Sequence, residues 1–173
     1  VGVAMDRNVG SAVLSRARSL GTLPKAVAEY VANYVGNGED GQHMTVKVTN
    51  RRSYGSLRIG IEDDARGMDD NDLRRFFSVH AVNEARLQGR ASGGRFGTGK
   101  TAAFGVGESP QVETRRHGQK WVVRLEKFEI IAAAKEKVAP KPDVLDDGVA
   151  TDKPHETTVI LHGLTKTDDA TLV

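Results

Sequence analysis

The chain has 173 residues, of which 38% are hydrophobic and 28% are charged, and its formal net charge is +2. This length and composition fit one soluble domain with a single core and exclude two large ones. Because there is no cysteine, disulfides, zinc–thiolate sites and thiol nucleophiles are excluded. No apolar run is long enough for a membrane helix, and no secretion signal opens the chain. We expect a single cytoplasmic domain over residues 1–173, cut from a longer protein because the chain lacks an initiating Met and ends abruptly.

Helical spacing dominates the first part of the chain. It predicts a helix around Gly10–Leu20 and a second from Leu23 to Val35, with a proline near the start and glycines just past the end. On the second helix Glu29 and Asn33 are four residues apart and therefore share a face. A carboxylate and an amide oxygen there suit a water molecule and a Mg²⁺ ion. The alternative is two polar residues that face solvent.

Two strands and a short helix are predicted next. Alternating apolar residues indicate strands near His43–Thr49 and Ser56–Glu62, and a helix follows at Asp69–Phe77. The second strand runs into Asp63-Asp-Ala-Arg-Gly67-Met68. Asp63 could accept a hydrogen bond from an exocyclic amine, and Gly67 would let the backbone approach a flat ring. An ordinary polar turn would explain the same residues.

The segment from Gly94 to Thr101 fits the phosphate-loop pattern G-x-x-x-x-G-K-[ST]. A phosphate loop must follow a buried strand, but residues Asn83–Ser92 upstream are too polar to form one. Downstream, no apolar run ends in the Asp that such proteins use for Mg²⁺. We therefore reject the phosphate-loop fold, although the glycines and Lys100 still resemble a phosphate cradle.

The second half of the chain is predicted to be mainly strands, at Gln111–Arg116, Lys120–Glu126 and Thr157–His162. The two-residue turn at His117-Gly118 indicates antiparallel pairing. Residues Phe128–Val138 are ambiguous, and the Pro- and Asp-rich stretch before the last strand is expected to be a loop. The predicted fold class is α/β, a two-layer sandwich with helices packed on one face of a mixed, mainly antiparallel sheet.

Taken in order, Glu29…Asn33, Asp63–Met68 and Gly94-x-x-Gly97-x-Gly99-Lys100 resemble the N, G1 and G2 boxes of the GHKL ATPases. That family comprises DNA gyrase, the large heat-shock chaperone, histidine kinases and the MutL mismatch-repair proteins. The strand that begins at Thr157 is similar to the late G-T-x-x-x-L strand of the family. The resemblance implies the Bergerat fold of these ATP-binding domains.

The resemblance also implies roles for individual residues. Glu29 would polarise the attacking water as the catalytic residue, Asn33 would bind Mg²⁺, and Asp63 would receive the adenine amino group. The other nucleotide contacts would come from Arg66, Gly67 and Met68 after the strand, from Gly94, Gly97, Thr98, Gly99 and Lys100 at the end of a lid over residues 78–99, and from Thr157. The chain departs from the family pattern with Gly36, Ala65 and Glu156, where Asp, Gly and Gly are usual.

The function implied is Mg²⁺-dependent ATP binding and slow hydrolysis that drives a conformational or dimerisation cycle in a larger protein, as in MutL, gyrase, chaperone or MORC proteins. The alternatives are a histidine-kinase catalytic domain and a non-hydrolysing nucleotide sensor. Expected partners are ATP and ADP, further domains of the same chain and a second copy in an ATP-dependent homodimer, with no membrane. Basic pairs such as Arg51-Arg52 leave DNA open as a partner without indicating it.

Overall fold

The computed structural model describes residues 23–35, 45–53, 56–77, 107–136, 138 and 140–164. The helices in these ranges are α2 (Leu23–Val35), α3 (Asp70–Phe77) and α6 (Lys127–Glu136). The strands are β1 (Val46–Ser53), β2 (Ser56–Asp63), β3 (Ser109–Arg116), β4 (Gln119–Arg124), β5 (Asp143–Ala150) and β6 (Glu156–Leu164).

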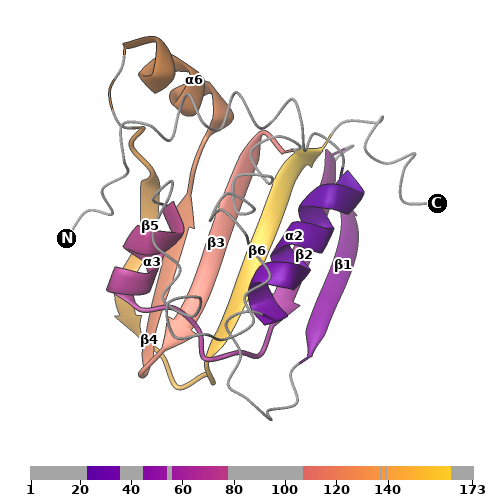
Figure 1. Cartoon of the computed structure of the whole chain (residues 1–173). Coiled ribbons are helices and arrows are strands. Elements are labelled where there is room, and N and C mark those ends of the chain that lie inside the picture. The colour runs from indigo at the N-terminus through magenta and orange to yellow at the C-terminus, as the bar shows by residue number, and fades with distance from the viewer. Residues whose placement is uncertain are drawn as a thin grey trace, which may run out of the picture.

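The six strands form one sheet in the order β1-β2-β6-β3-β4-β5 (Figure 1). Every pair of neighbours among these described strands is antiparallel. The last of the described strands, β6, lies in the middle of the sheet, between β2 and β3. Residues that are far apart in the sequence therefore become neighbours where these three strands meet.

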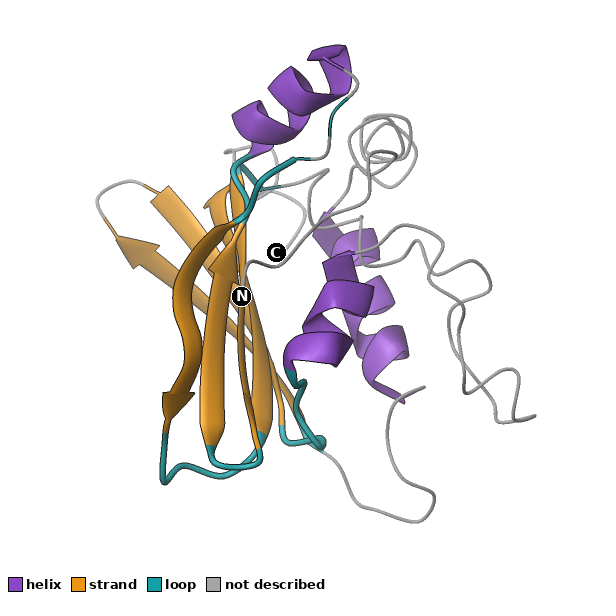
Figure 2. Cartoon of the chain, turned by 90° about the vertical axis from the view of Figure 1, so that its left-hand side faces the viewer, coloured by secondary structure: helices purple, strands orange, loops and turns teal. Residues whose placement is uncertain are grey.

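Helices α2 and α3 lie over one face of the sheet, and α6 lies beyond one end of it (Figure 2). Alternation along the strands points a set of apolar side chains at these helices: Ile59, Ile61, Val112, Trp121, Val123, Val159 and Leu161. They pack in one core with Leu23, Ala26 and Tyr30 of α2 and Leu73 of α3. Burying a large aliphatic side chain stabilises a fold by roughly 1.5–3 kcal/mol, so this layer holds the domain together. The predicted two-layer α/β sandwich is confirmed.

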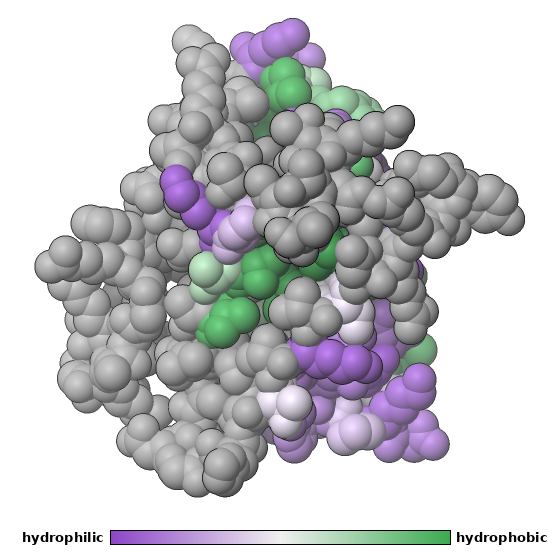
Figure 3. All heavy atoms as spheres, turned by 90° about the vertical axis from the view of Figure 1, so that its right-hand side faces the viewer, coloured by the Kyte–Doolittle hydropathy of each residue, from purple (hydrophilic) through white to green (hydrophobic). Residues whose placement is uncertain are grey.

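The other face of the sheet is polar. It carries the ion pairs Lys47–Glu62 at 3.7 Å and Lys120–Asp146 at 2.6 Å, and Arg115 Nη1 lies 2.8 Å from Glu156 Oε1. In Figure 3, which looks at the molecule from its β1 side, hydrophilic residues gather at the lower right, on the side of the sheet away from α2. The period-2 pattern thus separates a face that packs on helices from a charged one.

The turn between β3 and β4 matches its prediction. His117 and Gly118 both have positive φ, at 52° and 72°, as a type I′ hairpin requires. The Gly118 carbonyl also accepts a 2.9 Å hydrogen bond from the Thr151 N–H, which ties the hairpin to the segment after β5. The predicted antiparallel pairing of these strands is confirmed.

Several expected elements differ in the structure. The stretch expected to be a loop contains β5, an edge strand that pairs with β4 and packs only Val144 against the core while Leu145 and Val149 are half exposed. The ambiguous segment forms α6, and β1 begins at Val46 and runs to Ser53. The helix predicted at 10–20, the lid at 78–99 and Lys100 lie outside the described residues. None of the described helices is long and apolar enough to span a membrane.

Candidate functional site

Three polar residues lie side by side where β2, β6 and β3 adjoin. Thr157 of β6 is the register partner of Asp63 on β2 and of Thr114 on β3. Directly opposed residues in antiparallel strands have Cβ atoms about 4.5–5.5 Å apart and point to the same face. That face is the one that carries Ile61 and Val159 and lies toward the helices. We call Asp63, Thr114 and Thr157 the strand-end site.

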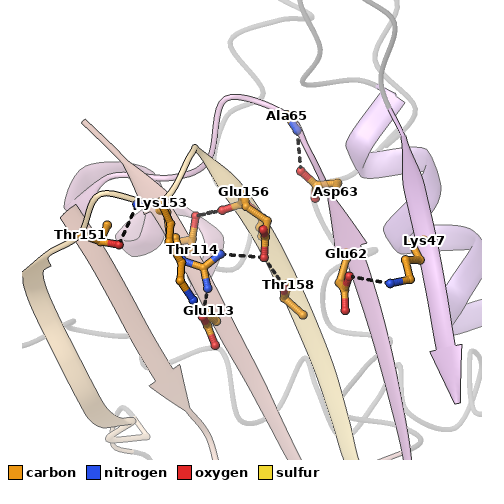
Figure 4. A network of polar contacts seen from close by, with 12 residues as sticks. Lys47, Glu62, Asp63, Ala65, Glu113, Thr114, Thr151, Lys153, Glu156 and Thr158 are labelled. Carbon is orange, nitrogen blue, oxygen red and sulfur yellow. Dashed lines mark hydrogen bonds and ion pairs between the residues drawn. The ribbon is translucent and has the colours of Figure 1, made fainter. Parts of the chain in front are cut away.

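Asp63 is the last residue of β2 and is half buried. Its Oδ1 accepts a 3.1 Å hydrogen bond from the Ala65 N–H (Figure 4). Burial raises the pKa of Asp63 to about 6; the Ala65 hydrogen bond opposes this shift, whereas the charges of Asp64 and Glu156 add to it. At neutral pH Asp63 is therefore mainly a poorly hydrated carboxylate, which suits it to accept a hydrogen bond from an uncharged donor.

Thr114 joins the strand-end site to the loop that follows Asp63. Its side chain is fully buried. Its Oγ1 accepts a 2.7 Å hydrogen bond from the Met68 N–H, lies 3.1 Å from Thr157 Oγ1, and donates to the Glu156 carbonyl at 3.2 Å. The side chain of Met68 is partly buried and packs against the core. One hydroxyl on β3 therefore connects the loop with β6.

Gly67 holds the same loop against β3. It has a φ of +69°, and a Cβ added there would lie 1.9 Å from the Arg115 carbonyl oxygen. A side chain would thus clash with the backbone as well as strain it. From the sequence, the glycine was expected to permit the approach of a ring. The structure provides a different reason for it, which is the contact between loop and strand.

Charged residues fix the end of the loop and the start of α3. Asp69 caps the helix by accepting a 3.0 Å hydrogen bond from the Asp72 N–H. The Arg116 guanidinium bonds Asp69 Oδ2 at 3.0 Å and also contacts Asp72. Arg66, which was predicted to lie beside the adenine, has its Nη2 3.4 Å from Asp72 Oδ1, with 47% of its side chain exposed. Its predicted nucleotide contact stays a prediction.

Two of the departures from the family pattern are explained by the strand geometry. The Glu156 side chain lies on the polar face of the sheet, where its Oε1 forms an ion pair with Arg115 and accepts a 3.1 Å hydrogen bond from the Thr158 hydroxyl (Figure 4). Thr157, the next residue, therefore points to the helix side, whatever side chain precedes it. Ala65 is buried in the turn after Asp63, so its methyl group fits there.

The structure brings together only some of the predicted site residues. Glu29 and Asn33 both lie on α2, a continuous helix on the face of the sheet that carries the strand-end site, so their positions are one turn and about 6 Å apart along its axis. The side chains of these two residues lie outside the described part of the structure. So do all residues of the predicted phosphate-binding segment, namely Gly94, Gly97, Thr98, Gly99 and Lys100.

Sequence reasoning missed Thr114 and Arg116. The signal for Thr114 was present but weak, because it is a polar residue at an inward position of the alternating strand Gln111–Arg116. Arg116 could not be distinguished from a solvated arginine at a strand end, since its partners lie 44 and 47 residues away in the sequence.

In a comparison with protein families, the chain matches the family described as histidine kinase-, DNA gyrase B-, and HSP90-like ATPase over residues 22–156. The matched range includes α2, the strand that ends at Asp63, and the glycine-rich segment at 94–100. No curated protein matches the chain. Because the family match covers well over half of the sequence and the α/β sandwich agrees with it, the chain belongs to the histidine kinase-, DNA gyrase B- and HSP90-like ATPases, a family of generally ATP-binding domains.

Proposed function

We propose that this chain binds Mg²⁺-ATP and hydrolyses it slowly, and that the cycle drives a conformational change or dimerisation in a larger protein. The observation that carries the proposal is the half-buried Asp63 carboxylate beside Thr157 at the end of adjoining strands. Membership of an ATPase family supports it. The two residues were assigned to adenine from the sequence, and they are register partners in the fold.

Asp63 would select the base. A carboxylate accepts a hydrogen bond from the amino group of adenine, whereas guanine has a carbonyl oxygen at that position and would be repelled. A charge-assisted hydrogen bond contributes about 1.5–3 kcal/mol. We therefore expect ATP to be preferred over GTP by at least ~2 kcal/mol, or roughly thirtyfold in Kd.

The residues for the chemical step are assigned by family membership and by the geometry of α2. Positions 29 and 33 are one turn apart, so Glu29 as the base and Asn33 as a Mg²⁺ ligand would address the same volume. An amide oxygen is a suitable Mg²⁺ ligand, and the ion would neutralise charge on the phosphates. Backbone N–H groups of residues 94–100 would surround the phosphates, with Lys100 as an added point charge.

Calorimetric titration of ATP and GTP in the presence of Mg²⁺ tests base recognition. Asp63→Ala should weaken ATP binding by about 1.5–3 kcal/mol and should not weaken GTP binding, because it removes the carboxylate that repels the guanine carbonyl. Lys100→Ala is the comparison variant. It should weaken ATP binding less than the same change does in a phosphate-loop protein, because backbone amides share the contact with the phosphates. Abolished ATP binding in Lys100→Ala beside normal binding in Asp63→Ala would contradict the assignment and restore the phosphate-loop interpretation.

The fate of the γ-phosphate separates the proposed ATPase from its alternatives. With labelled ATP, an ATPase releases inorganic phosphate, a histidine-kinase catalytic domain labels a protein histidine, and a nucleotide sensor does neither. We expect phosphate release.

Light scattering with and without a non-hydrolysable ATP analogue tests the proposed ATP-dependent dimerisation. Dimerisation predicts a doubled mass only in the presence of the analogue and Mg²⁺.

A further inference from the structure

The Thr114 hydroxyl has as many partners as it can serve. A threonine hydroxyl offers one hydrogen and two lone pairs. Thr114 Oγ1 has three polar neighbours: the Met68 N–H at 2.7 Å, the Glu156 carbonyl at 3.2 Å and the Thr157 hydroxyl at 3.1 Å. The group is fully buried, so an unmade bond would cost it the full loss of hydration.

The chemistry of two partners fixes the direction of the third bond. The Met68 N–H can only donate, so it occupies one lone pair of Thr114. The Glu156 carbonyl can only accept, so it takes the single Thr114 hydrogen. Thr157 must then donate to the remaining lone pair of Thr114, because any other arrangement leaves one of the three contacts without a hydrogen.

The direction of this bond sets what Thr157 can offer to a ligand. With its hydrogen directed at Thr114, the Thr157 hydroxyl presents only lone pairs. Its register partner Asp63 is a carboxylate at neutral pH and also only accepts. The strand-end site thus has two acceptors side by side, which fit a group with two hydrogens to donate, such as an exocyclic amine or a bridging water.

We propose that Thr114 is a positioning residue that determines base selectivity by holding Thr157 as an acceptor. The inference rests on the proposed ATP-binding function and adds to it a residue that does not touch the nucleotide. When the Thr114 hydroxyl is absent, the Thr157 hydrogen is released and can turn toward the ligand. A base with a carbonyl oxygen in place of the amine then gains a donor from Thr157 and is rejected less strongly, although Asp63 still repels it.

The test compares ATP with inosine triphosphate, which carries a carbonyl oxygen in place of the amino group on the same sugar and triphosphate. The quantity measured is the Kd for inosine triphosphate divided by the Kd for ATP. In Thr114→Val, which keeps the shape of the side chain and removes the hydroxyl, this ratio should fall by about tenfold. Thr114→Ser keeps the hydroxyl and should keep the ratio. If Thr114→Val weakens both nucleotides equally, the ratio is unchanged and Thr114 is only structural, which overturns the proposal.

A double-mutant cycle tests whether the effect passes through Thr157. Thr157→Val alone should lower the ratio, and adding Thr114→Val should lower it no further. A further fall of the ratio in the double variant would overturn the proposal that Thr114 acts through the Thr157 hydroxyl. If Thr114→Val fails to fold, Thr114→Cys takes its place with the same expectation, because a thiol fills a similar volume but is a weak hydrogen-bonding group.

The unmutated chain separates this inference from the proposed function. If the wild-type chain binds ATP and every Thr114 variant has the same ratio of Kd values as the wild type, the proposed function stands. Only the proposal that Thr114 acts through Thr157 is then overturned. Wild-type chain that binds neither nucleotide overturns the proposed function, and the inference with it.

Discussion

Asp63 is the residue at which stability and binding oppose each other. Burial raises its pKa to about 6, so its charge is held in the folded protein at a cost, which the Ala65 N–H reduces. A folded-state pKa above the ordinary value means that the folded chain binds this proton more tightly than the unfolded chain does. The contribution of Asp63 to stability is therefore fully present below its ordinary pKa and is lost as pH rises to about 6.

Asp63→Asn removes this charge and keeps the shape of the side chain. We expect its Tm to approach that of the wild type near pH 4, to exceed it by a growing margin up to about pH 7, and to keep that margin at higher pH. The same substitution should weaken ATP binding. Thermal melts over this pH range measure the difference, with exposed Asp152→Asn as the control. A margin that does not depend on pH would show that Asp63 carries no buried charge.

Glu29 is assigned to the chemical step rather than to binding. Glu29→Gln keeps the size and hydrogen bonding of the side chain but removes the base, so ATP should bind with nearly unchanged Kd while turnover falls by roughly 10²-fold or more. Phosphate release and calorimetry on the same sample give both numbers. Turnover at the wild-type rate in this variant would exclude Glu29 as the water-activating group.

Among the elements, β3 anchors the loop after Asp63 through three successive residues. Thr114 bonds the Met68 N–H, the Arg115 carbonyl packs against Gly67, and Arg116 holds the start of α3. These contacts use a side-chain hydroxyl, a backbone oxygen and a guanidinium in turn. The loop after Asp63 is therefore held in place by β3, a strand that lies about fifty residues later in the sequence than Asp63.

Gly67→Ala tests the central anchor, with Gly118→Ala as a matched control. Both glycines have positive φ, at 69° and 72°, so both variants should lose about 1 kcal/mol from backbone strain. At Gly118 an added Cβ meets nothing closer than 3.8 Å, whereas at Gly67 it would lie 1.9 Å from the Arg115 oxygen. Gly67→Ala should therefore cost several kcal/mol in denaturant unfolding. Equal losses would mean that the loop moves freely away from β3.

The elements with strong local patterns were predictable from the sequence, and those that depend on distant partners were not. The hairpin at His117-Gly118 followed from turn chemistry, and α2 followed from its apolar spacing and flanking residues. The edge strand β5 was missed, because only one of its side chains packs against the core and its pairing is supplied by β4. For the site, Asp63 and Thr157 were assigned through their motifs, whereas the connection of both to Thr114 appears only when β6 lies between β2 and β3.

At the scale of the whole molecule, the proposed nucleotide site requires the complete sheet. Asp63 and Thr157 are separated by most of the described chain, and they meet only after β6 has entered the centre of the sheet. The proposed Mg²⁺ ligand lies on α2, which packs over the same face. A nucleotide that contacts all of these elements should therefore stabilise the fold as a unit and raise Tm.

Asn33→Ala tests whether nucleotide binding stabilises the fold and whether Mg²⁺ contributes to that stabilisation. At a free concentration of one hundred times its Kd, a ligand stabilises the folded state by about 2.7 kcal/mol, which corresponds to a Tm increase of roughly 5–10 °C for a chain of this size. We expect Mg²⁺-ATP to give this increase in the wild type and a smaller one when Mg²⁺ is removed by chelation. In Asn33→Ala, Mg²⁺ should add little, since the proposed ligand is missing and Mg²⁺-ATP affinity falls roughly tenfold. Adenosine, which needs only the strand-end site, should bind both proteins equally. An equal loss for adenosine and Mg²⁺-ATP would instead assign Asn33 to the support of α2.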